Sequence, residues 1–245
     1  TVLMVQVENE VGVIPESRDH TPNAEAAFAG PVPVELMTYL TAHRATLNPE
    51  LRAAWEANGG RASGSWTEVF GDEGMTDSLF MSWSYARYID HVAAAGKAEY
   101  ALPMFTNAAL IRPNYEPGQY NSGGPLPFAM DLWKAGAPAL DFLAPDIYFD
   151  NYAYWASQYR RPDNVLFVPE ARGGAIGAAN ALYTFGALKG FGFSPFGIDE
   201  RGVQLAGDPS VGLGTGGDGD PVIGALYGQL EQLAPLVLEK QAEGK

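Results

Sequence analysis

Five apolar segments of strand-like composition, separated by segments of helical periodicity, constrain the fold of this chain most strongly. Their runs of Val, Leu, Ile, Phe, Met and Ala are typical of strands that are covered on both faces. We expect strands at residues 2–7, 101–107, 142–148, 164–170 and 190–194. Because strands that alternate with helices form α/β folds with a parallel sheet, that is the fold class we predict.

Helical periodicity fills the intervals between these strands. The longest expected helix carries a face formed by Met81, Tyr85, Tyr88 and Val92. Its N-cap is expected at Thr76 or Asp77, and its end at Gly96. Further helices are expected at residues 34–40, 49–57, 127–135, 152–159 and 175–188.

The last helix is predicted after Asp220, an N-cap residue that is followed by proline at the first helical position. Its apolar stripe consists of Leu226, Leu230, Leu233 and Val237. Pro235 is expected to kink or end the helix. The glycine-rich run at residues 212–219 is predicted to be a loop, because no strand directly precedes it and Asp218 and Asp220 would repel a pyrophosphate.

Composition narrows the classes of function. The 245 residues are 47% hydrophobic, include no Cys and carry a formal net charge of 15 − 29 = −14. Without Cys there is no thiol nucleophile, disulfide or thiolate zinc site, and the acidity argues against nucleic acid or an anionic membrane as a partner. The three His residues lie in no metal-binding or nucleophile-activating pattern. Since the chain opens on a strand without an initiator Met or a signal peptide, we expect it to be a piece of a longer protein.

Two acidic motifs follow predicted strands. Glu8, Asn9 and Glu10 come directly after the first strand, and Glu170 ends the fourth. Active sites of parallel α/β folds lie at the carboxyl ends of the strands. Glycoside hydrolysis needs two carboxyl groups there, one to donate a proton and one to attack the sugar. The alternative is structural, with each Glu capping a helix or pairing with Arg.

Other polar and aromatic residues leave similar alternatives open. Asn107, at the end of the second strand, contacts sugar hydroxyls or caps a loop, and Glu8 binds substrate or orients its neighbours. An aromatic stretch after the third strand forms either a wall that stacks against a sugar or part of the core. It consists of Tyr148, Phe149, Tyr152, Tyr154 and Trp155.

The segment Val5-Gln6-Val7-Glu8-Asn9-Glu10-Val11-Gly12 resembles the acid/base motif of glycoside hydrolase family 35, the β-galactosidases, with Val11 at a position that is usually aromatic. The resemblance implies that Glu10 is the general acid/base and that Asn9 binds the sugar 2-hydroxyl. It also implies that Glu170 is the nucleophile and that Tyr148 donates a hydrogen bond to it. Residues 191–199 resemble the final strand of a bacterial subgroup, without the Trp that many members of the clan carry there.

The resemblance implies a partial TIM (β/α)8 barrel in which strands four to eight are present and the first three βα units are missing. Residues 1–245 would then be the C-terminal portion of a catalytic domain, expected to fold poorly or be inactive alone. It further implies a retaining mechanism on a β-galactoside, with carboxyl groups about 5–5.5 Å apart and no metal or cofactor. The alternatives are a retaining barrel glycosidase of β-glucosidase or β-mannanase type and a non-catalytic barrel fragment that binds carbohydrate. Linkage specificity, compartment and oligomeric state stay open.

Overall fold

The computed structural model describes residues 2–72, 74–112, 114–198 and 220–243. The chain divides into two compact units, Thr1–Leu143 and Ala144–Lys245, which are described separately below. The predicted Gly-rich loop at 212–219, with its G-x-G-x-x-G pattern, and the last residue of segment 191–199 lie outside the described residues. Within the described part of the chain, no helix is both long enough and apolar enough to cross a membrane.

The five predicted strands are confirmed, and so is the α/β class. They are β1 (Val5–Gln6), β2 (Met104–Ala109), β3 (Phe142–Ile147), β4 (Phe167–Ala171) and β5 (Gly192–Pro195). Sheet order follows chain order, and the pairs β1–β2, β3–β4 and β4–β5 are parallel. Strand β1 is shorter than the predicted 2–7, because its ladder with β2 joins only Val5 to Met104 and Gln6 to Phe105.

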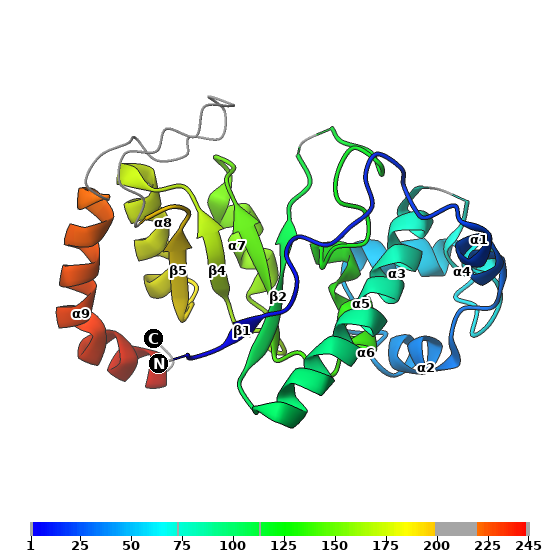
Figure 1. Cartoon of the computed structure of the whole chain (residues 1–245), viewed down its shortest axis with the longest axis horizontal. Helices are drawn as coiled ribbons and strands as arrows, with labels where there is room; N and C mark the ends of the chain where they lie inside the picture. The colour runs from blue at the N-terminus through cyan, green and yellow to red at the C-terminus, as the bar shows by residue number, and fades with distance from the viewer. Residues whose placement is uncertain (1, 73, 113, 199–219, 244–245) are drawn as a thin grey trace. The chain divides into compact units, whose positions relative to one another are not determined.

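The first unit contains β1, β2 and most of the helices (Figure 1). These are α1 (Pro22–Ala29), α2 (Val34–Ala42), α3 (Pro49–Ala57), α4 (Trp66–Phe70), α5 (Gly74–Glu99), the 3₁₀ turn η1 (Pro127–Ala129) and α6 (Met130–Gly136). Helices α1 and α4 were not among the predicted elements. Helix α4 nevertheless carries a capping box, in which Ser65 Oγ accepts from the Glu68 N–H and Glu68 Oε2 accepts from the Ser65 N–H.

Helix α5 corrects two predictions. It begins at Gly74, before the predicted caps, and continues through Gly96 to Glu99. Gly96 serves close packing rather than termination, since a Cβ there would lie 2.8 Å from Met104 Cε. The predicted face is only partly buried, with Tyr88 51% exposed. The buried face includes Leu79, Trp83, Ala86, Ile89 and Ala93, whose spacing follows the helical repeat.

The described part of the second unit contains the end of β3, then β4, β5 and the helices α7 (Tyr152–Tyr159), α8 (Gly174–Gly186) and α9 (Pro221–Ala242). As predicted, Asp220 caps α9, with its Oδ1 accepting from the Val222 and Ile223 N–H groups at 3.1 Å. Helix α9 packs on α8, continues past Pro235 and changes direction toward its C-terminal end (Figure 1), as expected for a helix with an interior proline. Of its predicted stripe, Leu226 is buried but Leu233 is exposed.

Candidate active site

The segment after β1 has an unusual backbone. Glu8 and Glu10 both adopt the left-handed region, with φ of 59° and 45°. For residues other than glycine this conformation costs roughly 1–3 kcal/mol each and persists only where surrounding contacts enforce it. The contacts around the Glu8-Asn9-Glu10 motif therefore define the site in the first unit.

The Asn9 side chain is oriented by two donors. Gln6 Nε2 donates to Asn9 Oδ1 at 3.1 Å, and Asn107 Nδ2 donates to the same oxygen at 3.0 Å. Because both donors meet the oxygen, the amide group has a defined orientation, with its nitrogen directed away from them. No described residue accepts a hydrogen bond from Asn9 Nδ2, and Asn9 is exposed, so its contact with a sugar hydroxyl stays a prediction.

The main chain of Glu10 is held on both sides by asparagine side chains. Asn107 Oδ1 accepts from the Glu10 N–H at 3.0 Å, and Asn121 Nδ2 donates to the Glu10 carbonyl at 2.7 Å. Asn107 is fully buried and lies within β2, which continues to Ala109 and so extends beyond the predicted strand end at Asn107. Its bonds to Glu10 and Asn9 show that Asn107 orients these two neighbours, and its contact with sugar hydroxyls stays a prediction.

Asn121 is fixed by the packing of its own segment. A Cβ at Gly12 would lie 2.5 Å from the Asn121 carbonyl carbon, so only glycine allows the two segments to approach this closely. The next residue, Ser122, exchanges backbone hydrogen bonds with Val13 at 2.8 and 3.0 Å. Ser122 Oγ also bonds to the buried Ser78 Oγ of α5 at 2.7 Å. The support of Glu10 therefore extends to α5.

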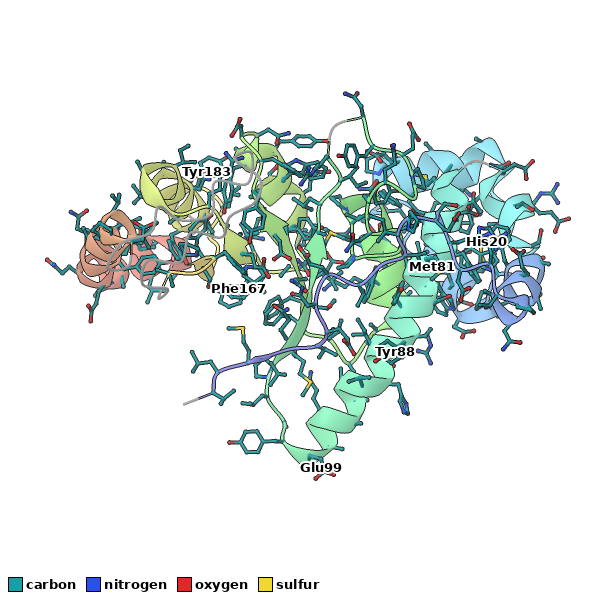
Figure 2. All side chains as sticks on the ribbon, turned by 45° about the horizontal axis from the view of Figure 1, so that its top comes forward. His20, Met81, Tyr88, Glu99, Phe167 and Tyr183 are labelled. Atoms are coloured by element: carbon teal, nitrogen blue, oxygen red, sulfur yellow. The ribbon has the colours of Figure 1, made fainter. Side chains whose placement is uncertain are left out.

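Glu8 is bound by α5. The Tyr88 hydroxyl donates to Glu8 Oε1 at 2.7 Å, and this hydrogen bond, together with the Glu8 charge, raises the pKa of Tyr88. Figure 2 shows the N-terminal segment running beside α5 from Tyr88 past Met81, whose sulfur accepts from the Asp19 N–H. The predicted role of Glu8 in orienting neighbours matches these contacts, and a role in binding substrate stays a prediction.

In the second unit, the strand ends bring Tyr148 to Glu170. Asp146 of β3 is in register with Glu170 of β4. Two residues further along, the Tyr148 hydroxyl donates to Glu170 Oε2 at 2.7 Å. This confirms the hydrogen bond that the family resemblance implied, and it fixes the orientation of the Glu170 carboxylate. Because hydrogen bonds to charged groups are strong, the pair is a defined arrangement.

Asp146 is an acidic residue of this site that sequence reasoning missed. Its side chain is 2% exposed, and one of its carboxylate oxygens lies within 4.8 Å of a Glu170 oxygen. Burial first, and then the charge of Asp146, raise the pKa of Tyr159 well above its ordinary value. The sequence could have indicated Asp146, because residues two apart in a strand lie on the same face, and Asp146 precedes Tyr148 by two residues.

The aromatic stretch divides between core and surface. Tyr152 is buried and bonded to Thr184 Oγ1, so it belongs to the core. Trp155 is half-buried and makes an edge contact with Tyr154, with ring centroids 5.2 Å apart. Tyr154 is exposed and Phe149 half-buried, so the stacking wall stays a prediction for these rings.

The structure thus gathers the predicted residues in two groups: Glu8, Asn9, Glu10 and Asn107 in the first unit, and Tyr148 and Glu170 in the second. The catalytic roles predicted for Glu10 and Glu170 and the separation of their carboxyl groups stay predictions, as does the absence of a metal or cofactor. Comparison with known families and with curated proteins finds no matching family model and no matching protein. The functional assignment therefore depends on the chemistry of these residues.

Proposed function

We propose that this protein is a retaining glycoside hydrolase of β-galactosidase type, with Glu170 as nucleophile and Glu10 as general acid/base. The observation that carries the proposal is the 2.7 Å hydrogen bond from Tyr148 to Glu170 at the carboxyl ends of β3 and β4. A strand-end carboxylate that is oriented by a phenol suits attack on an anomeric carbon. A second strand-end carboxylate, Glu10, stands on a segment whose main chain is held by two asparagines.

The reaction proceeds by two displacements. In the first, a Glu170 oxygen forms a bond to the anomeric carbon while the bond to the leaving oxygen breaks, and Glu10 gives that oxygen its proton. In the second, Glu10 takes a proton from water, whose oxygen displaces Glu170 from the sugar. Both residues end in their starting protonation states, and the anomeric configuration is retained.

Two neighbouring side chains serve this chemistry. Tyr148 keeps Glu170 Oε2 in place while the carboxylate attacks. Asn9 presents its amide nitrogen to the sugar, as the family resemblance implies for the 2-hydroxyl. Hydrogen bonds to this hydroxyl strengthen in the transition state of such reactions.

We propose further that the five strands correspond to strands four to eight of a (β/α)8 barrel. Glu10 follows β1, and Glu170 is the penultimate residue of β4, three strands later in the sheet order. Strands four and seven, which carry the acid/base and the nucleophile in the resembling clan, are also three apart. The parallel sheet supports this assignment.

The test of the nucleophile uses the full-length protein and an activated 2-deoxy-2-fluoro-β-galactoside. The fluorine slows the second displacement, so the glycosyl-enzyme accumulates. We expect one sugar adduct on the peptide that contains Glu170, detected by mass spectrometry, and none in Glu170→Gln. Glu35→Gln on the exposed side of α2 is the matched control and should label like the parent. Full nitrophenyl galactoside turnover by Glu170→Gln would contradict the mechanism.

The test of the acid/base compares leaving groups. Glu10→Gln is expected to slow phenyl galactoside hydrolysis by about 10²–10⁴-fold, because this leaving group needs a proton. A dinitrophenyl galactoside, which leaves without one, should lose much less in kcat/KM. A panel of nitrophenyl glycosides separates galactosidase from the glucosidase and mannanase alternatives. Carbohydrate binding without turnover or adduct on any of these sugars would indicate the non-catalytic alternative.

A further inference from the structure

We infer that Asn107 and Asn121 are positioning residues that hold the acid/base Glu10 through its main chain; this inference rests on the proposed function. The two amides approach the same residue from different segments. Asn107 Oδ1 accepts from the Glu10 N–H at 3.0 Å, and Asn121 Nδ2 donates to the Glu10 carbonyl at 2.7 Å. Both polar groups of the Glu10 backbone are therefore bound by side chains.

The backbone conformation explains why two such contacts are needed. Glu10 has φ of 45°, which a residue other than glycine adopts only when its surroundings enforce it. Relaxation of this angle toward the ordinary right-handed or extended regions would swing the Glu10 side chain to a new direction. A general acid must lie within hydrogen-bond reach of the leaving oxygen, so such a rotation would remove it from the reaction.

The two asparagines themselves are fixed. Asn107 is fully buried within β2, and its Nδ2 also donates to Asn9 Oδ1 at 3.0 Å. Asn107 thereby sets the orientation of both residues of the Asn-Glu pair. Asn121 is half-buried and is kept in place by the close approach of Gly12 and by the backbone pairing of Ser122 with Val13.

The experiment uses Asn107→Ala and Asn121→Ala in the full-length protein, with phenyl and 2,4-dinitrophenyl β-galactosides or the same glycosides of the sugar that the panel selects. Misplacement of a catalytic group by about 1 Å can cost roughly 10²-fold in rate. We expect kcat/KM for the phenyl glycoside to fall by about that factor in each variant. For the dinitrophenyl glycoside, which needs no proton, kcat/KM should stay near the parent value. The ratio of the two values is the readout.

Asn48→Ala is the matched control. Asn48 also bridges two backbone groups with its amide, accepting from the Glu50 N–H at 2.8 Å and donating to the Pro127 carbonyl at 3.1 Å, but it caps α3. Loss of this side chain should leave the substrate ratio unchanged. If the buried Asn107 variant does not fold, the half-buried Asn121 variant still decides the question.

The outcomes separate the inference from the proposed function. Labelling of Glu170 by the fluorinated sugar in the parent and both variants, with a selective loss on the phenyl glycoside, supports both. An equal loss on both substrates, or no loss on either, overturns the positioning role while the labelled Glu170 leaves the proposed function intact. If the fluorinated sugar does not label Glu170 in the parent protein, both the proposed function and the positioning role are contradicted.

Discussion

The exchange of Gly12 for alanine tests the architecture that surrounds Glu10. A Cβ built on Gly12 would lie 2.5, 2.6 and 2.7 Å from the carbonyl carbon, Cβ and Cα of Asn121. Carbon atoms in favourable contact are about 3.5–4.0 Å apart. Because the obstructing atoms are mainly backbone, no side-chain rotation relieves the clash, and the two segments must separate by about 1 Å.

The cost follows from the hydrogen bonds that join these segments. They are the bond from Asn121 Nδ2 to the Glu10 carbonyl at 2.7 Å and the two bonds between Val13 and Ser122 at 2.8 and 3.0 Å. Each contributes on the order of 1 kcal/mol, so complete separation would lower the free energy of unfolding by about 3 kcal/mol. Loss of the single Asn121 bond sets the lower limit at about 1 kcal/mol.

Urea unfolding followed by circular dichroism measures this difference. Gly224→Ala is the control with the same chemical change, since a Cβ on Gly224 in α9 meets no atom within 4 Å. Alanine there should be neutral or stabilising by up to about 1 kcal/mol, because it has the higher helix propensity. A change of less than about 0.5 kcal/mol in the unfolding free energy of Gly12→Ala would contradict the close approach of these two segments.

Two further predictions concern the first unit. Ser65→Ala removes the capping box of α4 and should lower the free energy of unfolding by about 1 kcal/mol in urea; no change would show that this helix end needs no cap. Although burial opposes it, hydrogen bonds from Lys97 and the Met104 N–H, with the charges of Lys97 and Lys134, lower the pKa of Asp141 below its usual 3.8. The ionised form therefore stabilises the fold above pH 3.8, and this contribution disappears as the pH falls through the lowered folded value. Asp141→Asn should be less stable than the parent at neutral pH, with a difference in urea unfolding that shrinks below pH 3.8; a constant difference would contradict the assignment.

Local patterns predicted much of the fold. The five strands were recognisable because buried parallel strands are nearly continuous apolar runs. Helix α7 was predicted at its observed bounds, and Asp220 was identified as the cap of α9 from the Asp-Pro pair. Helix α4 was overlooked although its capping box stands in the sequence. The end of α5 was misplaced at Gly96, because a glycine that permits close packing looks the same in sequence as one that ends a helix.

The residues of the candidate site likewise include some that local sequence patterns predicted and some that they did not. Glu8, Asn9, Glu10 and Glu170 were recognised because they lie at or just after the end of a recognisable strand. The Tyr148–Glu170 hydrogen bond agrees with the family resemblance. Asn121 could not be recognised from a local sequence pattern, because it binds the Glu10 carbonyl across 111 residues of sequence.

By itself, the sequence determined the class of fold, the approximate positions of the five strands and the acidic groups near their carboxyl ends. Strand pattern and terminal residues are local properties, and local chemistry is sufficient to recognise them. Tertiary structure alone decided that Asn107 and Asn121 bind the Glu10 backbone and that Tyr88 binds Glu8. These contacts join residues far apart in the chain, and they exist only because packing brings β2, α5 and the segment around Ser122 against the end of β1.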